Sequence, residues 1–115
     1  MIQSMAIIEY LDEVFPEPPL LPEDPIGRAR VRALAYIVVC DIHPLNNLRV
    51  LAYLVRALGQ VEEDRLRWYR HWVGCGLDTI EELLLDHPNT GPFCHGDGPT
   101  LADICLVSQV YNVRR

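Results

Sequence analysis

The stretch VEEDRLRWYRHWVGCGLDTIEELLLD, residues 61–86, decides the fold class of this chain. Apolar residues recur in it at steps of three or four, which is the spacing that places side chains on one face of an α-helix. They are Leu66, Tyr69, Val73, Leu77, Ile80 and Leu84. We therefore expect one long helix. Gly74 and Gly76 interrupt it, and because each costs about 1 kcal/mol relative to alanine, we expect tight packing against another helix there.

Helical patterns also precede this segment. Asp24 and Pro25 form a helix start, because aspartate caps free amides and the fixed φ of proline suits the first helical position. Pro44 must break or kink that helix, since proline lacks the amide proton and its ring clashes with the preceding turn. A helical pattern resumes after Pro44, and we expect Gly59 to end it.

The segment that follows residues 61–86 is a turn-rich loop, 87–99, and then a last helix that begins at Leu101. Thr100 and Asp103 form a capping box in which aspartate takes the usual place of glutamate. No strand pattern of useful length is found anywhere in the sequence. The predicted fold class is therefore all-α.

The N-terminal segment, residues 1–15, has helical spacing, with Ser4 as the expected N-cap. Five prolines then fall within ten residues, which predicts an extended linker over 16–24. They are Pro16, Pro18, Pro19, Pro22 and Pro25. This linker separates the apolar stripe of the first helix from its partners, and the last helix reaches Arg115 without a stop signal. We interpret the chain as a fragment or a shortened gene product.

Composition narrows the function. The 115 residues make one domain with a net charge of −6 and no basic stripe, which does not favour a nucleic-acid partner. Six acids and no bases lie between Glu9 and Asp24, so a small anionic ligand must be held by local arginines. The four cysteines lack metal-ligand spacing and indicate reduced thiols in the cytoplasm. No apolar run is long enough to span a membrane, and we expect no metal.

Six strings, in this order, carry a family resemblance. They are QSMAIIEYL at 3–11, CDIHPLNNLRVL at 40–51, WYRHWV at 68–73, FCHGD at 93–97, PTLADICLV at 99–107 and QVYN at 109–112. Together they resemble the zeta-class glutathione transferases, the family of the maleylacetoacetate and maleylpyruvate isomerases. The resemblance implies that 1–15 is the last helix of a truncated thioredoxin-like domain and that 16–24 is a linker. It implies that 25–115 is the C-terminal helical bundle, shortened at its end.

The resemblance also implies a reaction. Zeta-class enzymes are cytoplasmic homodimers that use glutathione to convert the cis double bond of a maleyl keto acid to trans. Their thiol adds to the double bond, rotation follows, and the thiol leaves. The serine motif that activates the thiol precedes this chain in the family, so we expect no catalytic residue here and no turnover by this polypeptide alone.

By resemblance, Gln3, Ser4, His43 and Asn47 are the glutathione-binding residues. A helix N-terminus with a hydroxyl suits a carboxylate, and an imidazole and an amide can donate to carbonyls. Arg49 and Arg115 are the residues expected to bind the carboxylates of a dicarboxylic keto acid, since guanidinium groups hold carboxylates bidentately.

Two other classes of function stay open. The chain can be a non-catalytic structural or interaction module of glutathione-transferase type. It can also belong to a general transferase or dehalogenase that acts on another small electrophile, because related scaffolds serve several chemistries.

Overall fold

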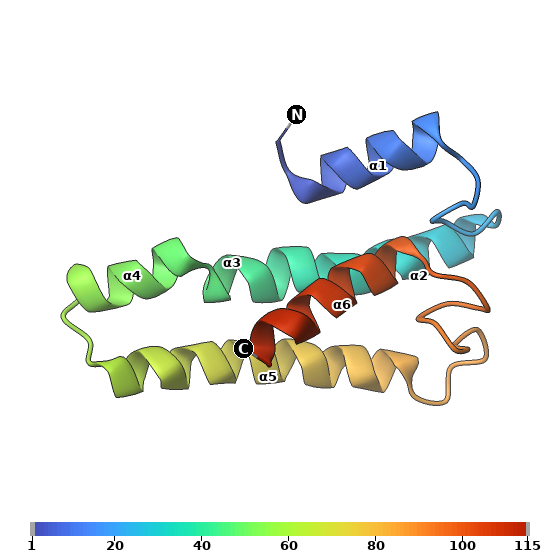
Figure 1. The fold of residues 1–115 in the computed structure, drawn as a ribbon. Coiled ribbons are helices and arrows are strands. Elements are labelled where there is room, and N and C mark those ends of the chain that lie inside the picture. Colours follow the sequence, from blue (N-terminus) through green and yellow to red (C-terminus); the bar gives the residue numbers. More distant parts are fainter. Residues whose placement is uncertain (1, 115) are drawn as a thin grey trace.

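The computed structural model describes residues 2–114, and these residues form helices and loops without a β-strand. Figure 1 shows the helices in chain order. Their bounds are α1 Ser4–Val14, α2 Pro25–Tyr36, the π-helical segment η1 Ile37–Ile42, α3 His43–Asn46, α4 Leu48–Arg56, α5 Glu62–Leu84 and α6 Leu101–Val113. The all-α prediction is confirmed.

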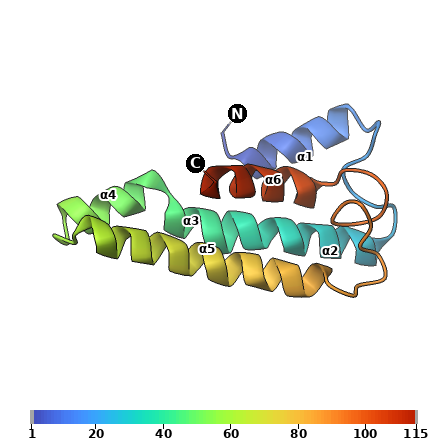
Figure 2. The ribbon, with the colours of Figure 1, turned by 60° about the horizontal axis from the view of Figure 1, so that its bottom comes forward.

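Two long antiparallel rods form the frame of the molecule. The first consists of α2, η1 and α3 in succession, and the second is α5; α6 packs on the first rod and crosses it obliquely (Figures 1 and 2). The buried core lies between them. Its apolar members are Val31, Leu34, Ala35, Val38, Ile42, Val73, Ile80, Cys94, Leu101, Ala102 and Cys105.

The predicted start of α2 is confirmed. Asp24 has extended backbone dihedral angles, and its Oδ1 accepts the Gly27 amide at 2.7 Å. Pro25 occupies the first helical position. The rod therefore begins where its sequence predicts, because the capping oxygen replaces one missing helical acceptor.

The helix does not stop at Pro44. The π-helical segment precedes the proline, and the His43 amide reaches back to the Val38 carbonyl, five residues earlier. The helix passes through Pro44 and ends two residues later, because Asn47 turns to an extended conformation with φ −64° and ψ 142°. The Asn47 side chain then starts α4 by accepting the Arg49 amide at 3.0 Å. Gly59, with φ 66°, lies in the turn beyond, so α4 ends earlier than predicted, at Arg56.

The long helix α5 follows its apolar periodicity, but only one of its glycines is a packing site. A β-carbon added at Gly76 would overlap Ile42 Cγ1 and lie 2.5 Å from its Cδ1. A β-carbon at Gly74 would meet no heavy atom within 4 Å. The expectation of tight packing is confirmed at Gly76 and wrong at Gly74, which faces open space.

The capping box is confirmed at the start of α6. Asp103 Oδ2 accepts the Thr100 amide at 2.8 Å and the Thr100 hydroxyl at 2.6 Å. Its other oxygen accepts the Cys94 amide at 2.9 Å, which ties the 87–99 loop to the helix. The Leu101 amide donates to the Leu20 carbonyl at 3.0 Å and so joins the proline-rich linker to the same point.

The first helix lies on the rest of the molecule, contrary to the expectation that the linker separates it from its partners. Met5 and Ile8 pack against the core, and Cys105 Sγ lies 3.9 Å from Met5 Sδ. Glu9 approaches Arg32 of α2 at 3.6 Å. The N-cap is Gln3 rather than the predicted Ser4, which is the first helical residue. Linker prolines are thus compatible with docking of α1.

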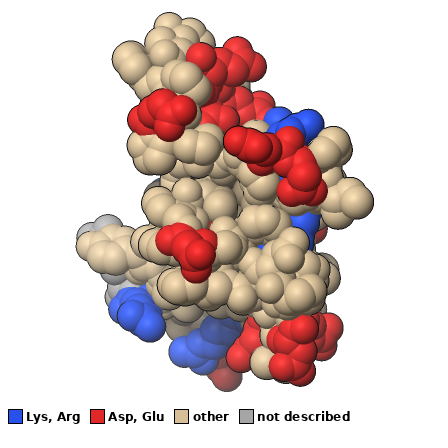
Figure 3. Space-filling model, turned by 90° about the vertical axis from the view of Figure 1, so that its right-hand side faces the viewer, with Lys and Arg blue, Asp and Glu red and all other residues tan. Residues whose placement is uncertain are grey.

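The acidic stretch lies at the end of the molecule where α1 meets the linker, and Figure 3 views that end, with acids prominent on it. All four cysteines are free thiols. Among residues 2–114, no helix is long and apolar enough to cross a membrane.

Candidate functional site

A cleft of about 1090 Å³ lies where α1, η1, α3, α4, α5 and α6 meet. Three of the predicted ligand-binding residues, Ser4, His43 and Asn47, line it. They come from two segments far apart in sequence, the start of α1 and the short helix α3 with the break that follows it. Docking of α1 on the bundle is therefore what assembles this site.

The start of α1 has an unusual backbone. Gln3 has φ 74° and ψ 115°, a region that non-glycine residues rarely adopt. Such a conformation costs about 1–3 kcal/mol and is found most often at functional sites. The Gln3 side chain is exposed and does not line the cleft, whereas its neighbour Ser4 does.

The helix break directs donors toward the cleft. Asn47 Oδ1 is used to cap α4, which leaves its Nδ2 without a partner among the described residues. His43 is exposed at the first position of α3, directly after the π-helical segment. The amide of Asn47 and the imidazole of His43 can therefore donate to a ligand carbonyl or carboxylate.

The arginines of the cleft are not the two that were predicted. Arg49 is exposed on α4 and is not among the cleft residues, and Arg115 lies outside the described residues. Arg65 and Arg70 of α5 line the cleft instead. The roles of Arg49 and Arg115 in binding stay predictions.

The two α5 arginines differ in their availability. Arg65 forms hydrogen bonds with both carboxylate oxygens of Glu62, and this pairing raises the pKa of Arg65 and lowers the pKa of Glu62. Arg70 forms no hydrogen bond or ion pair with any residue of 2–114. Arg70 is therefore the cation of the cleft that can take a ligand carboxylate without breaking an existing pair.

Two buried amides also line the cleft. Asn46 is 4 % exposed and Gln109 is 3 % exposed. Asn46 Oδ1, Asn46 Nδ2 and Gln109 Nε2 have no hydrogen-bond partner among the described residues. Sequence reasoning missed both residues, since an asparagine before a helix cap and a glutamine within an apolar helix carry no signal of their own.

Cys94, His95 and Asp97 do not form a nucleophilic site. Burial, with the neighbouring Asp103 carboxylate, raises the pKa of Cys94 to about 12, so its thiol stays protonated. His95 instead contacts Arg30 at 3.3 Å. Among residues 2–114 no group of three potential metal ligands is found.

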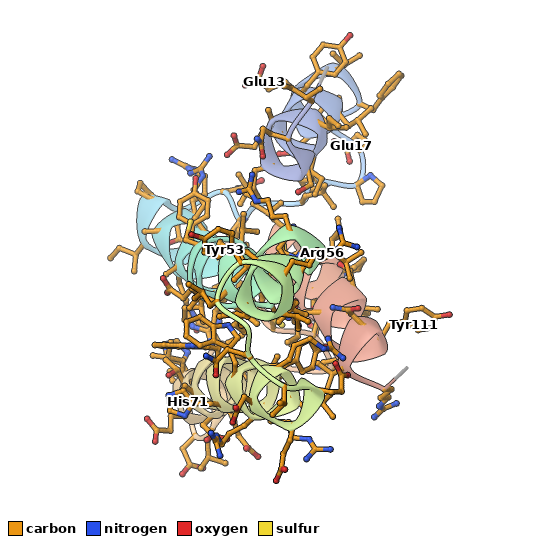
Figure 4. All side chains as sticks on the ribbon, turned by 90° about the vertical axis from the view of Figure 1, so that its left-hand side faces the viewer. Glu13, Glu17, Tyr53, Arg56, His71 and Tyr111 are labelled. Atoms are coloured by element: carbon orange, nitrogen blue, oxygen red, sulfur yellow. The ribbon has the colours of Figure 1, made fainter. Side chains whose placement is uncertain are left out.

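A second hollow of about 420 Å³ lies between α4 and the start of α5 and is lined by Trp68, His71 and Trp72. Trp68 donates its indole N–H to the Leu45 carbonyl at 2.8 Å. Its ring packs edge-on against the ring of Trp72, with the two ring centroids 5.7 Å apart. In Figure 4, His71 and Tyr111 project from different sides of the bundle, so this hollow is separate from the α6 side. The surface of this hollow is mainly apolar, with Gln60, Asp64, Arg67 and His71 also on its lining.

Comparison with known proteins gives close relatives over the whole chain. The maleylacetoacetate isomerase of Rhizobium meliloti is 54 % identical over 115 residues, which are 100 % of this chain and 54 % of that protein. The maleylpyruvate isomerase of Ralstonia sp is 52 % identical over 115 residues, again 54 % of its length. The chain thus spans about half the length of the curated relatives it matches. It matches no protein-family model.

Solved structures show the same similarity as the sequence relatives. The holo structure of a maleylpyruvate isomerase, described as a bacterial zeta-class glutathione S-transferase, superposes with a TM-score of 0.96 at 52 % identity and covers 100 % of this chain and 54 % of the other. The fold matches that of the C-terminal helical domain of a glutathione transferase. Over its whole length the chain is similar to the corresponding half of the maleylacetoacetate and maleylpyruvate isomerases, relatives of the zeta class.

Proposed function

We propose that this chain supplies the helical side of the active site of a glutathione-dependent cis–trans isomerase of a maleyl keto acid. The observation that carries the proposal is the cleft in which Ser4, His43 and Asn47 meet. Relatives with the same fold support it, because the maleylacetoacetate isomerase of Anaeromyxobacter dehalogenans was solved with bound GSH, and with dicarboxyethyl glutathione and citrate.

The residues present fit glutathione. The tripeptide carries two carboxylates and two peptide units, so it needs cations and a set of donors and acceptors. The cleft offers the Ser4 hydroxyl at a helix start, the free Asn47 amide and the His43 imidazole. When bound, glutathione supplies the thiol chemistry. The residues of this chain bind and orient the ligand rather than activate sulfur.

The same proposal assigns the parts of the chain. Residues 1–15 are the last helix of a thioredoxin-like domain, 16–24 its linker and 25–115 the helical domain. Arg49 and Arg115 bind the carboxylates of the keto acid, as the family resemblance implies, and Arg70 adds a free guanidinium inside the cleft. A cytoplasmic homodimer is also part of the proposal. Sedimentation equilibrium of the purified protein tests the dimeric state.

A chimera tests the function. This chain replaces the matching half of the Rhizobium meliloti maleylacetoacetate isomerase, and turnover of maleylacetoacetate and maleylpyruvate is measured with glutathione. We expect isomerisation, and we expect Asn47→Ala to raise the KM for glutathione several-fold with little change in kcat, because one donor hydrogen bond of about 1 kcal/mol is lost. Gln60→Ala, an exposed amide outside the cleft, is the matched control.

The outcomes separate the three classes of function. A folded chimera that binds glutathione without isomerising either acid, but conjugates other electrophiles, indicates a general transferase. A folded chimera that does not bind glutathione indicates a non-catalytic module. Turnover by the 115-residue chain alone would contradict the proposal that sulfur activation lies outside it.

A further inference from the structure

The guanidinium group of Arg30 joins three parts of the fold away from the cleft. This side chain of α2 donates hydrogen bonds to the end of α5 and to the loop 87–99. Its acceptors are the Cys94 carbonyl at 2.6 Å, Thr90 Oγ1 at 2.8 Å, the Leu83 carbonyl at 3.3 Å and His95 Nδ1 at 3.3 Å. The position of the loop therefore depends on one cation and on the groups that accept from it.

These donors fix the state of both histidines of the loop. Arginine can only donate, so its hydrogen bond to His95 requires an unprotonated Nδ1 on that ring. The backbone amide of Asn89 is also a donor, and it reaches His87 Nδ1 at 3.2 Å. Each ring must then be neutral, with its proton on Nε2. The folded loop thus selects one tautomer at His87 and at His95.

Protonation of either ring would remove an acceptor and add positive charge beside Arg30. Partial removal from water, and then the nearby Arg30 and His95, lower the pKa of His87. Burial raises the pKa of Cys94 to about 12, and at Asp103 hydrogen bonds exceed the effect of burial and lower the pKa. Neither of these two groups changes charge between about pH 5 and 8, so the histidines are the groups of this cluster that respond there.

The loop is connected to the cleft through α6. The Cys94 amide donates to Asp103 at 2.9 Å, and Asp103 caps α6 by accepting the Thr100 amide at 2.8 Å. Further along the same helix, Ser108 and Gln109 line the cleft. Movement of the loop away from α2 would therefore remove a hydrogen bond that fixes the start of a cleft helix.

We propose that the loop 87–99 is a pH-sensitive element, held against Arg30 while His87 and His95 are neutral and released when they are protonated, which loosens the start of α6. The inference goes beyond the proposed function, because it involves no ligand and no residue assigned to binding.

The direction of the pH effect follows from the neutral rings. A group that the fold holds neutral contributes fully to stability above its unfolded pKa, about 6.5 for histidine, and its contribution is lost as pH falls through the lower folded pKa. The contribution of His87 is therefore present above about pH 6.5 and is lost below it. Carboxylates titrate near pH 4, so the range from about pH 7.5 to 5.5 isolates the histidines.

The test follows the 115-residue chain over that range by urea denaturation, amide hydrogen exchange and ¹H–¹⁵N spectra of the imidazoles. We expect the Nε2-protonated tautomer at His87 and His95 at the upper pH. On acidification we expect the urea midpoint to fall by roughly 0.5–1 M. We expect the Asn89 and Cys94 amides to exchange about tenfold faster, after correction for the intrinsic effect of pH.

Asparagine variants separate the loop from other histidines. In the double variant His87→Asn with His95→Asn, a neutral Oδ1 takes the place of each Nδ1, so we expect most of the fall in midpoint to disappear. His71→Asn makes the same change at an exposed histidine of α5 and should keep the full fall. This control shows whether the response belongs to the loop.

Each other result overturns the inference. An Nδ1-protonated tautomer at either loop histidine contradicts the state on which it depends. An equal fall in midpoint in the double variant and the wild-type chain places the pH response elsewhere. A fall without faster exchange of the Asn89 and Cys94 amides shows that the loop is not released. If the double variant does not fold, the tautomers and the amide exchange of the wild-type chain decide between these outcomes.

Discussion

Two glycines on one helix give a paired test of the packing. In Gly76→Ala the new β-carbon would overlap Ile42 Cγ1 and lie 2.5 Å from Cδ1, against an ordinary carbon contact of about 3.5–4.0 Å. Ile42 is 0 % exposed and cannot swing into solvent. Such overpacking costs about 1–3 kcal/mol. This cost offsets or exceeds the roughly 1 kcal/mol that alanine gains over glycine in a helix.

Gly74→Ala is the matched control, because it makes the same chemical change two residues earlier. Its β-carbon meets nothing within 4 Å, so only the helix preference acts. We expect Gly74→Ala to raise the free energy of unfolding by roughly 0.5–1 kcal/mol and Gly76→Ala to lower it by up to about 2 kcal/mol.

Urea denaturation followed by far-ultraviolet circular dichroism measures both variants, with the slopes compared to confirm that the unfolded reference is unchanged. The separation between the two midpoints is the decisive quantity, since helix propensity cancels in it. Equal midpoints, or a Gly76→Ala variant more stable than Gly74→Ala, would refute the contact between the two long rods at Ile42 as described.

Three further predictions concern the cap, an indole and the thiols. Burial alone would raise the pKa of Asp103, but its hydrogen bonds lower that pKa overall. The contribution of Asp103 to the free energy of unfolding is therefore full above about pH 4, the unfolded pKa, and is lost as pH falls through the lower folded pKa. Acid denaturation of Asp103→Asn should lack this loss. Trp68→Phe removes the indole bond to a main-chain carbonyl and should cost about 1 kcal/mol in urea denaturation. Exposed Cys40 and Cys75 should alkylate fully by mass spectrometry in the folded chain, while Cys94, with its raised pKa, should stay unmodified.

Local chemistry predicted most of the fold. Asp24, Thr100 and Asp103 were found from sequence because a cap uses only a few neighbouring residues. The helix α5 was found because its apolar spacing runs over many turns. The difference between Gly74 and Gly76 could not be found from the sequence, because it depends on where a side chain of another helix lies.

The candidate site was predicted only in part, for the same reason. Ser4, His43 and Asn47 were identified from strings that resemble a family, and the structure brings them to one cleft. Arg70 lies on α5 among many charged residues of that helix, and no local pattern separates it from them. Its position becomes visible only when α4, α5 and α6 come together around the cleft.

The position of the cleft follows from how the first rod ends. A π-helical turn takes about one more residue than an α-helical turn. The α-helical spacing that puts Val31 and Leu34 on the buried face therefore does not predict which way His43 points, because η1 lies between them. The helix then closes on Asn47, whose oxygen is used by α4 and whose nitrogen is left for the cleft. The proposed binding donor and the helix break thus share one residue. Asn47→Asp keeps the cap but removes the donor, so it separates the two roles. We expect α4 to persist by circular dichroism while glutathione affinity falls. Retained affinity in that variant would show that the break alone, and not the Asn47 amide, makes the site.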